Sequence, residues 1–314
     1  MKAKVLHLEV EDDPASLQVP SSETLETLTV VARRNVTVDM STCFPLLKTI
    51  ELTRVLFPIN FSMGFFSFFP SLETLLLDNV ALESPIHIFS PSLRILKVTH
   101  NERFNYEVHV WASHLVSLEY ECVDPRPGVF VVEGASSLVD AKITCWKRQR
   151  GEPWLGPMID CLSSVTKLTL NLSINQLLDL VEVVRARKGT SFSNMTCLTI
   201  CLCDCNCKYC FDSAICLLHK CPILEQLFLR FMNDDHQPNG PHEAAASPRK
   251  LSMSHLRQVQ MVADESYHSY DKIMAKWVEL LLENSTNLDQ ITIKRVDEEG
   301  PSSSQSYSER SPSN

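Results

Sequence analysis

Residues 70–98 read PSLETLLLDNVALESPIHIFSPSLRILKV and contain the pattern Leu-x-x-Leu-x-Leu twice, the second time with a final Val. The first copy begins at Leu72 and the second begins 21 residues later, at Leu93. A proline stands two positions before each copy, at Pro70 and Pro91. Proline cannot continue a preceding helix or donate a backbone hydrogen bond to a sheet, so it suits the corner where a strand begins. The stretch therefore predicts two short strands joined by a return arm.

The same pattern recurs along the whole chain, with Ile, Val, Met, Ala or an aromatic residue at some positions. Its twelve copies begin at Ala3, Leu25, Leu47, Leu72, Leu93, Leu115, Leu138, Val165, Met195, Leu224, Leu256 and Leu288. Successive copies lie 21–25 residues apart up to Leu138 and 27–32 residues apart after it. One match is weak evidence, but twelve in near register are typical of a leucine-rich repeat. We therefore expect an α/β leucine-rich-repeat solenoid of horseshoe shape, with a parallel strand ladder and return arms of loop or helix.

The lengths of the return arms differ between the two halves of the chain. The early arms are short and predict only loop or a helical turn. The later arms carry apolar residues at helical spacing within 174–184, 211–218 and 273–281. We therefore expect the helices to be concentrated after residue 155.

Two stretches interrupt the repeat. Residues 233–250 contain Asp-Asp, three Pro, Gly and Ala-Ala-Ala, and residues 297–314 are rich in Ser. Neither stretch can bury enough apolar surface to offset the entropy of ordering it. The sequence therefore predicts a solenoid over 1–232, a disordered insertion over 233–250, C-terminal repeats over 251–296 and a disordered tail over 297–314.

Composition and motifs exclude several classes of function. The 29 basic and 38 acidic residues leave a net charge of −9, which argues against binding to nucleic acid or to an anionic membrane. No apolar run approaches the roughly 20 residues of a membrane helix, and the start of the chain lacks a signal-peptide core. Glycine is scarce, and Gly151 and Gly156 are followed by Pro157-Met158 where a phosphate-binding loop needs Lys-Ser/Thr. We therefore expect a cytoplasmic or nuclear protein that is not an enzyme and has no cofactor.

Several phrases resemble the leucine-rich-repeat region of plant F-box proteins, particularly the large grass family. They are FPLLKTIELTRVLF (44–57), FPSLETLLLDNVALESP (69–85), SPSLRILKVTH (90–100) and FDSAICLLHKCPILEQLFLRF (211–231). Residues 252–294 are similar to the FBD-type C-terminal region of such proteins, in which a strand, a loop, an amphipathic helix and a last strand follow one another. The resemblance covers roughly residues 1–296.

The resemblance implies a protein–protein interaction module like the substrate-recognition region of an F-box/LRR subunit of a cullin-type (SCF) ubiquitin ligase. In the family, an N-terminal helical F-box docks a Skp-type adaptor, whereas Met1 is followed here by the strand-like residues 4–10, KVLHLEV. We therefore expect this chain to lack the F-box, and the adaptor to be a partner only of a longer form that carries one. The chain is then a fragment or truncated gene model, or an F-box-less relative that binds a target without delivering it for ubiquitination.

Eight of the 12 cysteines lie between Cys197 and Cys221. Four of them have C-x-C-x-C-x-x-C spacing and could bind zinc tetrahedrally, namely Cys203, Cys205, Cys207 and Cys210. Zinc ribbons and fingers instead use C-x-x-C pairs about a dozen or more residues apart, and buried cysteines are commonly small apolar residues. Disulfides are disfavoured in a reducing compartment. We expect no metal, and the alternative function is an F-box-independent competitive binder or a zinc- or redox-responsive scaffold through this cluster.

Three histidines, His100, His109 and His114, lie near Glu102 and Glu107 in the sequence. They straddle two expected strands without a fixed i,i+4 relation. The sequence therefore predicts that they are solvated loop residues and not a metal site.

The concave face of the strand ladder is the surface that repeat proteins use for binding. Strand alternation turns the residues before, between and after the second and third Leu-type positions outward. Their mixed charges make a single charged ligand a poor fit, whereas apolar, aromatic and Arg residues dominate interface energetics. We expect an unknown target protein to bind this face through Leu76, Ile95, Lys97, Glu119, Phe228 and Arg230.

Overall fold

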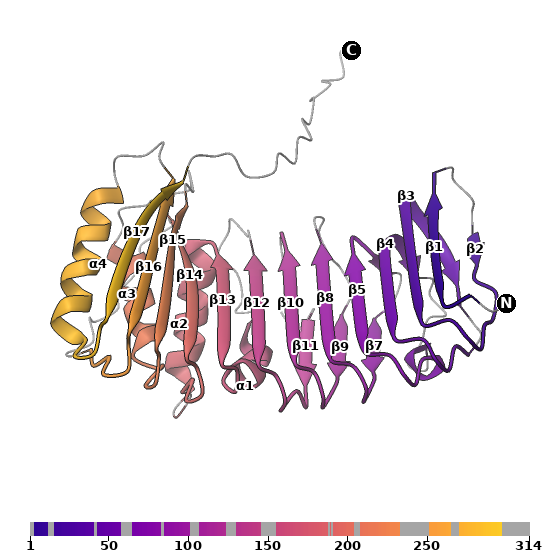
Figure 1. Cartoon of the computed structure of the whole chain (residues 1–314), viewed down its shortest axis with the longest axis horizontal. Coiled ribbons are helices and arrows are strands. Elements are labelled where there is room, and N and C mark those ends of the chain that lie inside the picture. Colours follow the sequence, from indigo (N-terminus) through magenta and orange to yellow (C-terminus); the bar gives the residue numbers. More distant parts are fainter. Residues whose placement is uncertain are drawn as a thin grey trace, which may run out of the picture.

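The chain forms a solenoid whose spine is a ladder of twelve parallel strands (Figure 1). The computed structural model describes residues 3–11, 16–40, 43–57, 65–82, 85–100, 107–123, 130–145, 155–187, 189, 191–203, 208–232, 251–264 and 270–296. In sheet order, the strands are β1 (Val5–Val10), β3 (Thr27–Asp39), β4 (Thr49–Phe57), β5 (Thr74–Asp78), β8 (Ile95–His100), β10 (Ser117–Cys122), β12 (Asp140–Cys145), β13 (Lys167–Leu172), β14 (Cys197–Cys203), β15 (Gln226–Met232), β16 (Gln258–Asp264) and β17 (Gln290–Val296). Two short strands complete a 14-stranded sheet, β2 (Ser16–Gln18) beside β3 and β6 (Ala81–Leu82) beside β4. Each of the twelve expected repeats supplies one rung of the ladder, which confirms a parallel-strand solenoid.

Each rung is a strand in which buried and outward residues alternate, and a backbone hydrogen bond to the preceding rung lies at the corner just before it. In β5, Leu75 and Leu77 are 1% and 3% exposed, while Leu76 between them points to the other side of the sheet. At the corner before β5, the N–H of Glu73 donates to the carbonyl of Lys48 on the preceding rung at 2.8 Å. The equivalent bond recurs at every step between rungs of the ladder. The repeat of this bond holds all rungs in one register.

The return arms of the middle repeats build a second parallel sheet. It has the order β11 (Phe130–Glu133), β9 (Val108–Trp111) and β7 (Ile86–Phe89). Our expectation that the early arms contain only loop or a helical turn is therefore wrong for these three repeats. Ile86, Val108 and Phe130 pair in register because they lie 22 residues apart, so equal arms bring equal positions side by side. A single-turn 3-10 helix, η1 (Phe65–Phe68), lies in an earlier arm.

The return arms of the later repeats contain helices. They are η2 (Gly156–Met158), α1 (Ile159–Leu162), α2 (Ile174–Ala186), α3 (Lys208–Leu218) and α4 (Tyr270–Asn284). In Figure 1, α2 and α3 lie behind the C-terminal rungs, and α4 lies at the C-terminal end of the ladder. Every α-helix in the described part of the chain begins after residue 155, as the arm lengths predict.

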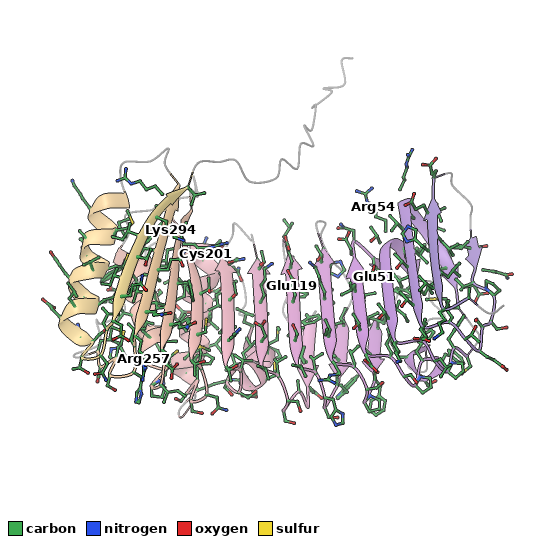
Figure 2. The ribbon with its side chains drawn as sticks, viewed as in Figure 1. Glu51, Arg54, Glu119, Cys201, Arg257 and Lys294 are labelled. Atoms are coloured by element: carbon green, nitrogen blue, oxygen red, sulfur yellow. The ribbon has the colours of Figure 1, made fainter. Side chains whose placement is uncertain are left out.

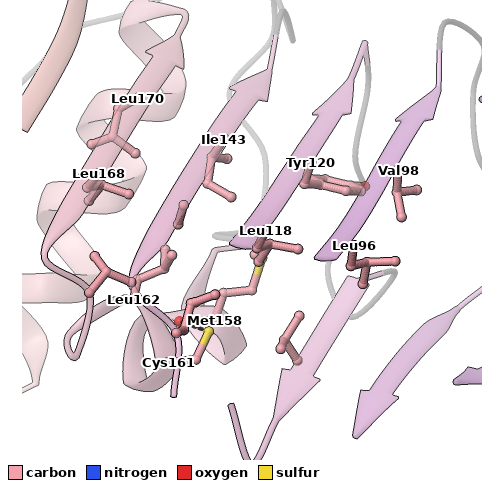
Figure 3. Packing of buried hydrophobic residues seen from close by; sticks show 14 of the residues in the cluster. Leu96, Val98, Leu118, Tyr120, Ile143, Met158, Cys161, Leu162, Leu168 and Leu170 are labelled. Carbon is pink, nitrogen blue, oxygen red and sulfur yellow. Dashed lines mark hydrogen bonds between the residues drawn. The ribbon is translucent and has the colours of Figure 1, made fainter. Parts of the chain in front are cut away.

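One apolar core runs along the solenoid between the ladder and the return arms. Figure 3 shows part of it, where Leu118 and Ile143 from the ladder meet Met158 and Leu162 from the return arm. The ring of Tyr120 on β10 stacks on Phe130 of β11 at 4.2 Å, which joins the two sheets. Burial of each repeat against its neighbours is the main source of stability in such an arrangement.

The predicted disordered segments, 233–250 and 297–314, lie outside the described residues. β15 and β16 pair directly, from Gln226 opposite Gln258 to Phe231 opposite Ala263, so the sheet is continuous from the predicted solenoid into the C-terminal repeats. The division of the chain into four segments stays a prediction.

Candidate functional site

The side of the ladder that faces away from the core is the candidate site, and we name it the ladder face. It consists of three rows of side chains, at the first, third and fifth residues after the corner of each rung. The central row follows the strand register from rung to rung: His7, Thr29, Glu51, Leu76, Lys97, Glu119, Lys142, Thr169, Thr199, Phe228, Gln260 and Thr292. Figure 2 shows Glu51, Glu119, Cys201 and Lys294 along this face. Residues that lie more than 20 positions apart in the sequence are thus neighbours here.

All six predicted binding residues lie on the ladder face. Leu76, Lys97, Glu119 and Phe228 belong to the central row. Ile95 lies in the row nearer the corner and is 43% exposed. The sixth residue, an exposed arginine at position 230, lies in the row beyond the central one. Their common placement makes one contact surface available to a partner, while their role in binding stays a prediction.

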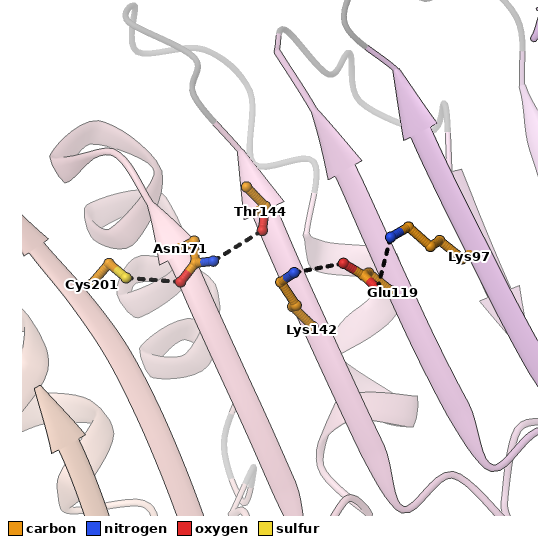
Figure 4. A network of polar contacts seen from close by, with 6 residues as sticks. All are labelled: Lys97, Glu119, Lys142, Thr144, Asn171 and Cys201. Atoms are coloured by element: carbon orange, nitrogen blue, oxygen red, sulfur yellow. Dashed lines mark hydrogen bonds and ion pairs between the residues drawn. The ribbon is translucent and has the colours of Figure 1, made fainter. Parts of the chain in front are cut away.

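A charged network occupies the middle of the central row (Figure 4). The Nζ of Lys142 donates to Oε1 of Glu119 at 2.6 Å, and Nζ of Lys97 lies 3.3 Å from Oε2. Partial burial favours the neutral form of Glu119, but the hydrogen bond from Lys142 and the charges of both lysines outweigh it and hold the pKa of Glu119 below its ordinary value of 4.5. The carboxylate is therefore ionised near neutral pH and shared between two rungs.

A second polar network lies next to it, in the row beyond (Figure 4). The Sγ of Cys201 donates to Oδ1 of Asn171 at 2.8 Å, and Nδ2 of Asn171 donates to Oγ1 of Thr144 at 3.2 Å. Cys201 is only 5% exposed, and burial raises the pKa of its thiol to about 11, although the charge of Arg230 acts in the opposite direction. The thiol therefore acts as a hydrogen-bond donor and not as a nucleophile at neutral pH.

Two open hollows lie on the ladder face, on either side of the charged network. The hollow nearer the N-terminus has a volume of about 370 Å³ and spans β4, β5, β8 and β10 around Leu76. The other has a volume of about 340 Å³ and spans β12–β16 around Phe228. Each hollow therefore combines a large outward apolar side chain with charged and other polar groups, which is how protein interfaces commonly place their anchors.

The described part of the cysteine cluster includes Cys197 and Cys221. Among the described side chains, no group of three or more His, Cys, Asp or Glu residues could hold a metal ion. Burial raises the pKa of Cys197, and raises that of Cys221 to about 12, so these thiols stay protonated at neutral pH. The side chains of the predicted zinc candidates lie outside the described residues, namely those of Cys203, Cys205, Cys207 and Cys210.

Two of the three clustered histidines are not loop residues, which corrects the sequence-based expectation. His100 lies at the end of β8, is 5% exposed, and has its pKa lowered to about 4 by burial. His109 lies on β9, where its ring stacks on His87 of β7 at 5.1 Å. Only His114 is exposed at a corner, with Nδ1 2.6 Å from the carbonyl oxygen of Pro91. The sequence argument failed because it ended the rung before His100 and overlooked the return-arm strand that contains His109.

The outer side of the second sheet carries a ring cluster that the sequence analysis missed. The ring of Trp111 stacks on His87 and on His109, each at 5.6 Å, and its Nε1 donates to Oε2 of Glu133 at 2.6 Å. The available signal was the alternation of apolar and other residues in IHIF, VHVW and FVVE, at equal spacing of 22 residues. That alternation is the usual pattern of a half-buried strand.

The comparisons with known proteins give no family. No family model, no curated protein and no solved structure matches this chain. Within the described residues, no helix is long and apolar enough to span a membrane.

Proposed function

We propose that this chain is a protein-interaction module, a leucine-rich-repeat horseshoe that recognises a target protein with its ladder face. The observation that carries the proposal is the uninterrupted register of the central row over twelve rungs. Such a face offers many side chains at fixed spacing, which suits an extended protein partner better than a small molecule. The two hollows around Leu76 and Phe228 supply apolar anchor points within it.

The resemblance to plant F-box/LRR proteins supports a more specific version of this proposal. In that version, the chain is the substrate-recognition region of an SCF-type ubiquitin ligase subunit that acts in the cytoplasm or nucleus. Its role is binding and not catalysis, and the proposal includes neither nucleic acid nor membrane as a partner. A Skp-type adaptor is then a partner of a form that carries an F-box.

The first test places a photo-crosslinking amino acid at Leu76 or Phe228 on the ladder face. The matched controls place it at Phe89, 64% exposed on the second sheet, and at Leu282, 62% exposed on α4. We expect the same crosslinked partner from both ladder-face positions and from neither control, in extracts of cells that express the protein. Equal crosslinking from all four positions would overturn the proposal.

The second test addresses the ligase version alone. This chain and any longer transcript of its locus are each incubated with a purified Skp-type adaptor. Retention of the adaptor by the longer form, together with crosslinking from Leu76 or Phe228, supports the ligase version. If no form retains the adaptor but the crosslinks persist, the ligase version is wrong and target binding stands.

A further inference from the structure

Charge is unevenly distributed along the ladder face. On the rungs β1–β12, the three rows carry six carboxylates and only two lysines. The carboxylates are Glu9, Glu51, Asp78, Glu119, Glu121 and Asp140, and the lysines are Lys97 and Lys142. On the rungs β13–β17, the described side chains of these rows include Lys167, Arg230 and Lys294 and no carboxylate. The face therefore changes from acidic to cationic along the solenoid.

The hollow nearer the N-terminus is acidic around an apolar floor. Glu51, Asp78 and Glu121 line it together with Leu76. Lys97, its only described cation, is paired with Glu119 at 3.3 Å. A Lys or Arg side chain fits this arrangement, because its hydrocarbon stem can cover the leucine while its charged end meets the carboxylates.

The hollow nearer the C-terminus has the opposite character. Phe228 and Arg230 line it with Asn171 and Gln260, and its other described cation, Lys142, is paired with Glu119 at 2.6 Å. The ring of Phe228 offers an apolar contact, and an exposed guanidinium binds a carboxylate with two parallel hydrogen bonds. An acidic segment with an aromatic residue fits here.

The distance between the hollows follows from the strand ladder. Leu76 on β5 and Phe228 on β15 are separated by six steps between neighbouring rungs. At about 4.8 Å per step, the two side chains lie about 29 Å apart along the sheet. Between them, Lys97 and Lys142 are both paired with Glu119, so these three charged groups already have partners within the ladder face.

We propose, on the basis of the function proposed above, that the ladder face binds one protein segment with a basic end on the Leu76 hollow and an acidic, aromatic end on the Phe228 hollow. The polarity of the partner is fixed, because the reverse orientation brings like charges together in both hollows. A nucleic acid does not fit, since its uniform negative charge is repelled by the acidic rungs. The inference thus defines the chemistry of the target and its direction along the solenoid.

The test uses synthetic peptides as probes against the full chain. One block contains Lys, Arg and Leu, and the other contains Asp, Glu and Phe. A Gly-Ser linker of roughly 28 residues joins them, because its root-mean-square length then matches about 29 Å. The controls are each block alone, a shuffled peptide of the same composition, and a two-block peptide whose linker of about two residues cannot span the distance. Fluorescence anisotropy measures each dissociation constant at low and high salt.

We expect the long two-block peptide to bind at least about tenfold more tightly than either block alone, and high salt to weaken it. The short linker and the shuffled sequence should lose this gain. Arg230→Glu should weaken binding of the acidic block and leave the basic block unchanged, and Glu121→Lys should do the reverse. Lys276→Glu and Glu279→Lys on the exposed side of α4 are the matched charge controls and should change neither.

Equal binding by the shuffled peptide, or no effect of Arg230→Glu and Glu121→Lys, overturns the inference. This failure is distinguishable from failure of the proposed function. If a target crosslinks to Leu76 and Phe228 but its affinity is unaffected by the two charge reversals, the ladder face is the binding site and only its proposed polarity is wrong. If no target crosslinks there, both proposals fail.

Discussion

The repeats before residue 155 and those after it share one strand pattern but return to the next rung differently. Three of the earlier repeats close with the short strands β7, β9 and β11, which form a second sheet. In the described part of the chain, helices lie in return arms of the later repeats, and α2 and α3 pack side by side. The strand ladder itself is continuous through both halves, and its strands are parallel from β1 to β17.

The length of the return arm explains the difference. A strand advances about 3.3 Å per residue and a helix only about 1.5 Å. A four-residue strand such as β9 therefore covers about 13 Å, for which a helix needs about nine residues. Replacing such a strand by a helix therefore needs about five more residues, and the rise in repeat length from 21–25 to 27–32 residues supplies about this number. Arm length thus selects strand or helix without any change in the rung.

The largest expected effect concerns the helical half. Trp277 on α4 is fully buried, and its ring lies 4.7 Å from that of Phe211 on α3. Trp277→Ala should cost about 3–5 kcal/mol of unfolding free energy, because it leaves a large cavity between two return arms. Urea unfolding measures the loss, and hydrogen exchange should place it in the C-terminal repeats. Leu282→Ala, at a 62% exposed position of the same helix, should change stability by no more than about 0.5 kcal/mol.

The next effect is a pH dependence that belongs to the strand-closed half. Burial lowers the pKa of His100 from 6.5 to about 4, so the unfolded chain binds the proton more tightly than the folded protein does. Stability should therefore fall as pH drops from 6.5 towards 4, by about 3 kcal/mol in total. Above pH 6.5 the residue should contribute no slope.

NMR titration of the His100 ring and unfolding at several pH values check this expectation. The variant His100→Gln should lose this part of the pH dependence and keep the rest. A wild-type slope that persists in His100→Gln would show that another group is responsible.

The second sheet provides a smaller test of the same half. Val110 lies on its central strand and is fully buried. Val110→Ala removes two buried methyl groups and should lower the free energy of unfolding by about 2 kcal/mol. Phe89→Ala, at a 64% exposed position of β7, is the control and should be nearly neutral. Equal, small effects of both variants in urea unfolding would mean that these arms add little stability.

The smallest expected effect lies on the ladder face of the earlier half, at Glu119. Glu119→Gln removes the carboxylate that Lys97 and Lys142 share, and should cost about 0.2–1 kcal/mol because all three groups are partly solvated. The pKa of Glu119 lies below 4.5, so its contribution is present above that pH and is lost as pH falls through the lowered value. Urea unfolding of the wild type and of Glu119→Gln measures the difference in unfolding free energy, and high salt should reduce that difference. A difference that grows at acid pH would contradict this account.

Several features were predictable from the sequence because they depend on local pattern. The pattern at Leu72, Leu75 and Leu77 predicts a rung, its buried face and its outward residue Leu76, and all are observed. The long apolar stripes predict α2, α3 and α4. The ring cluster at Trp111 was missed because each alternating stretch is only four residues long, so its signal emerges only when the three equally spaced return arms are compared.

The sequence by itself determined the number of rungs, the side of each rung that is buried, and the place where helices begin. These features follow from the two-residue period of strands, the 3.6-residue period of helices, and the length of chain available for each return arm. Only the tertiary structure decided which outward residues become neighbours. Glu119 contacts Lys97 and Lys142, and Cys201 contacts Asn171, because register pairs residues that are 22–30 positions apart. The charge of the ladder face and the protonation of its groups depend on those pairs, since electrostatic interactions act across space and not along the chain.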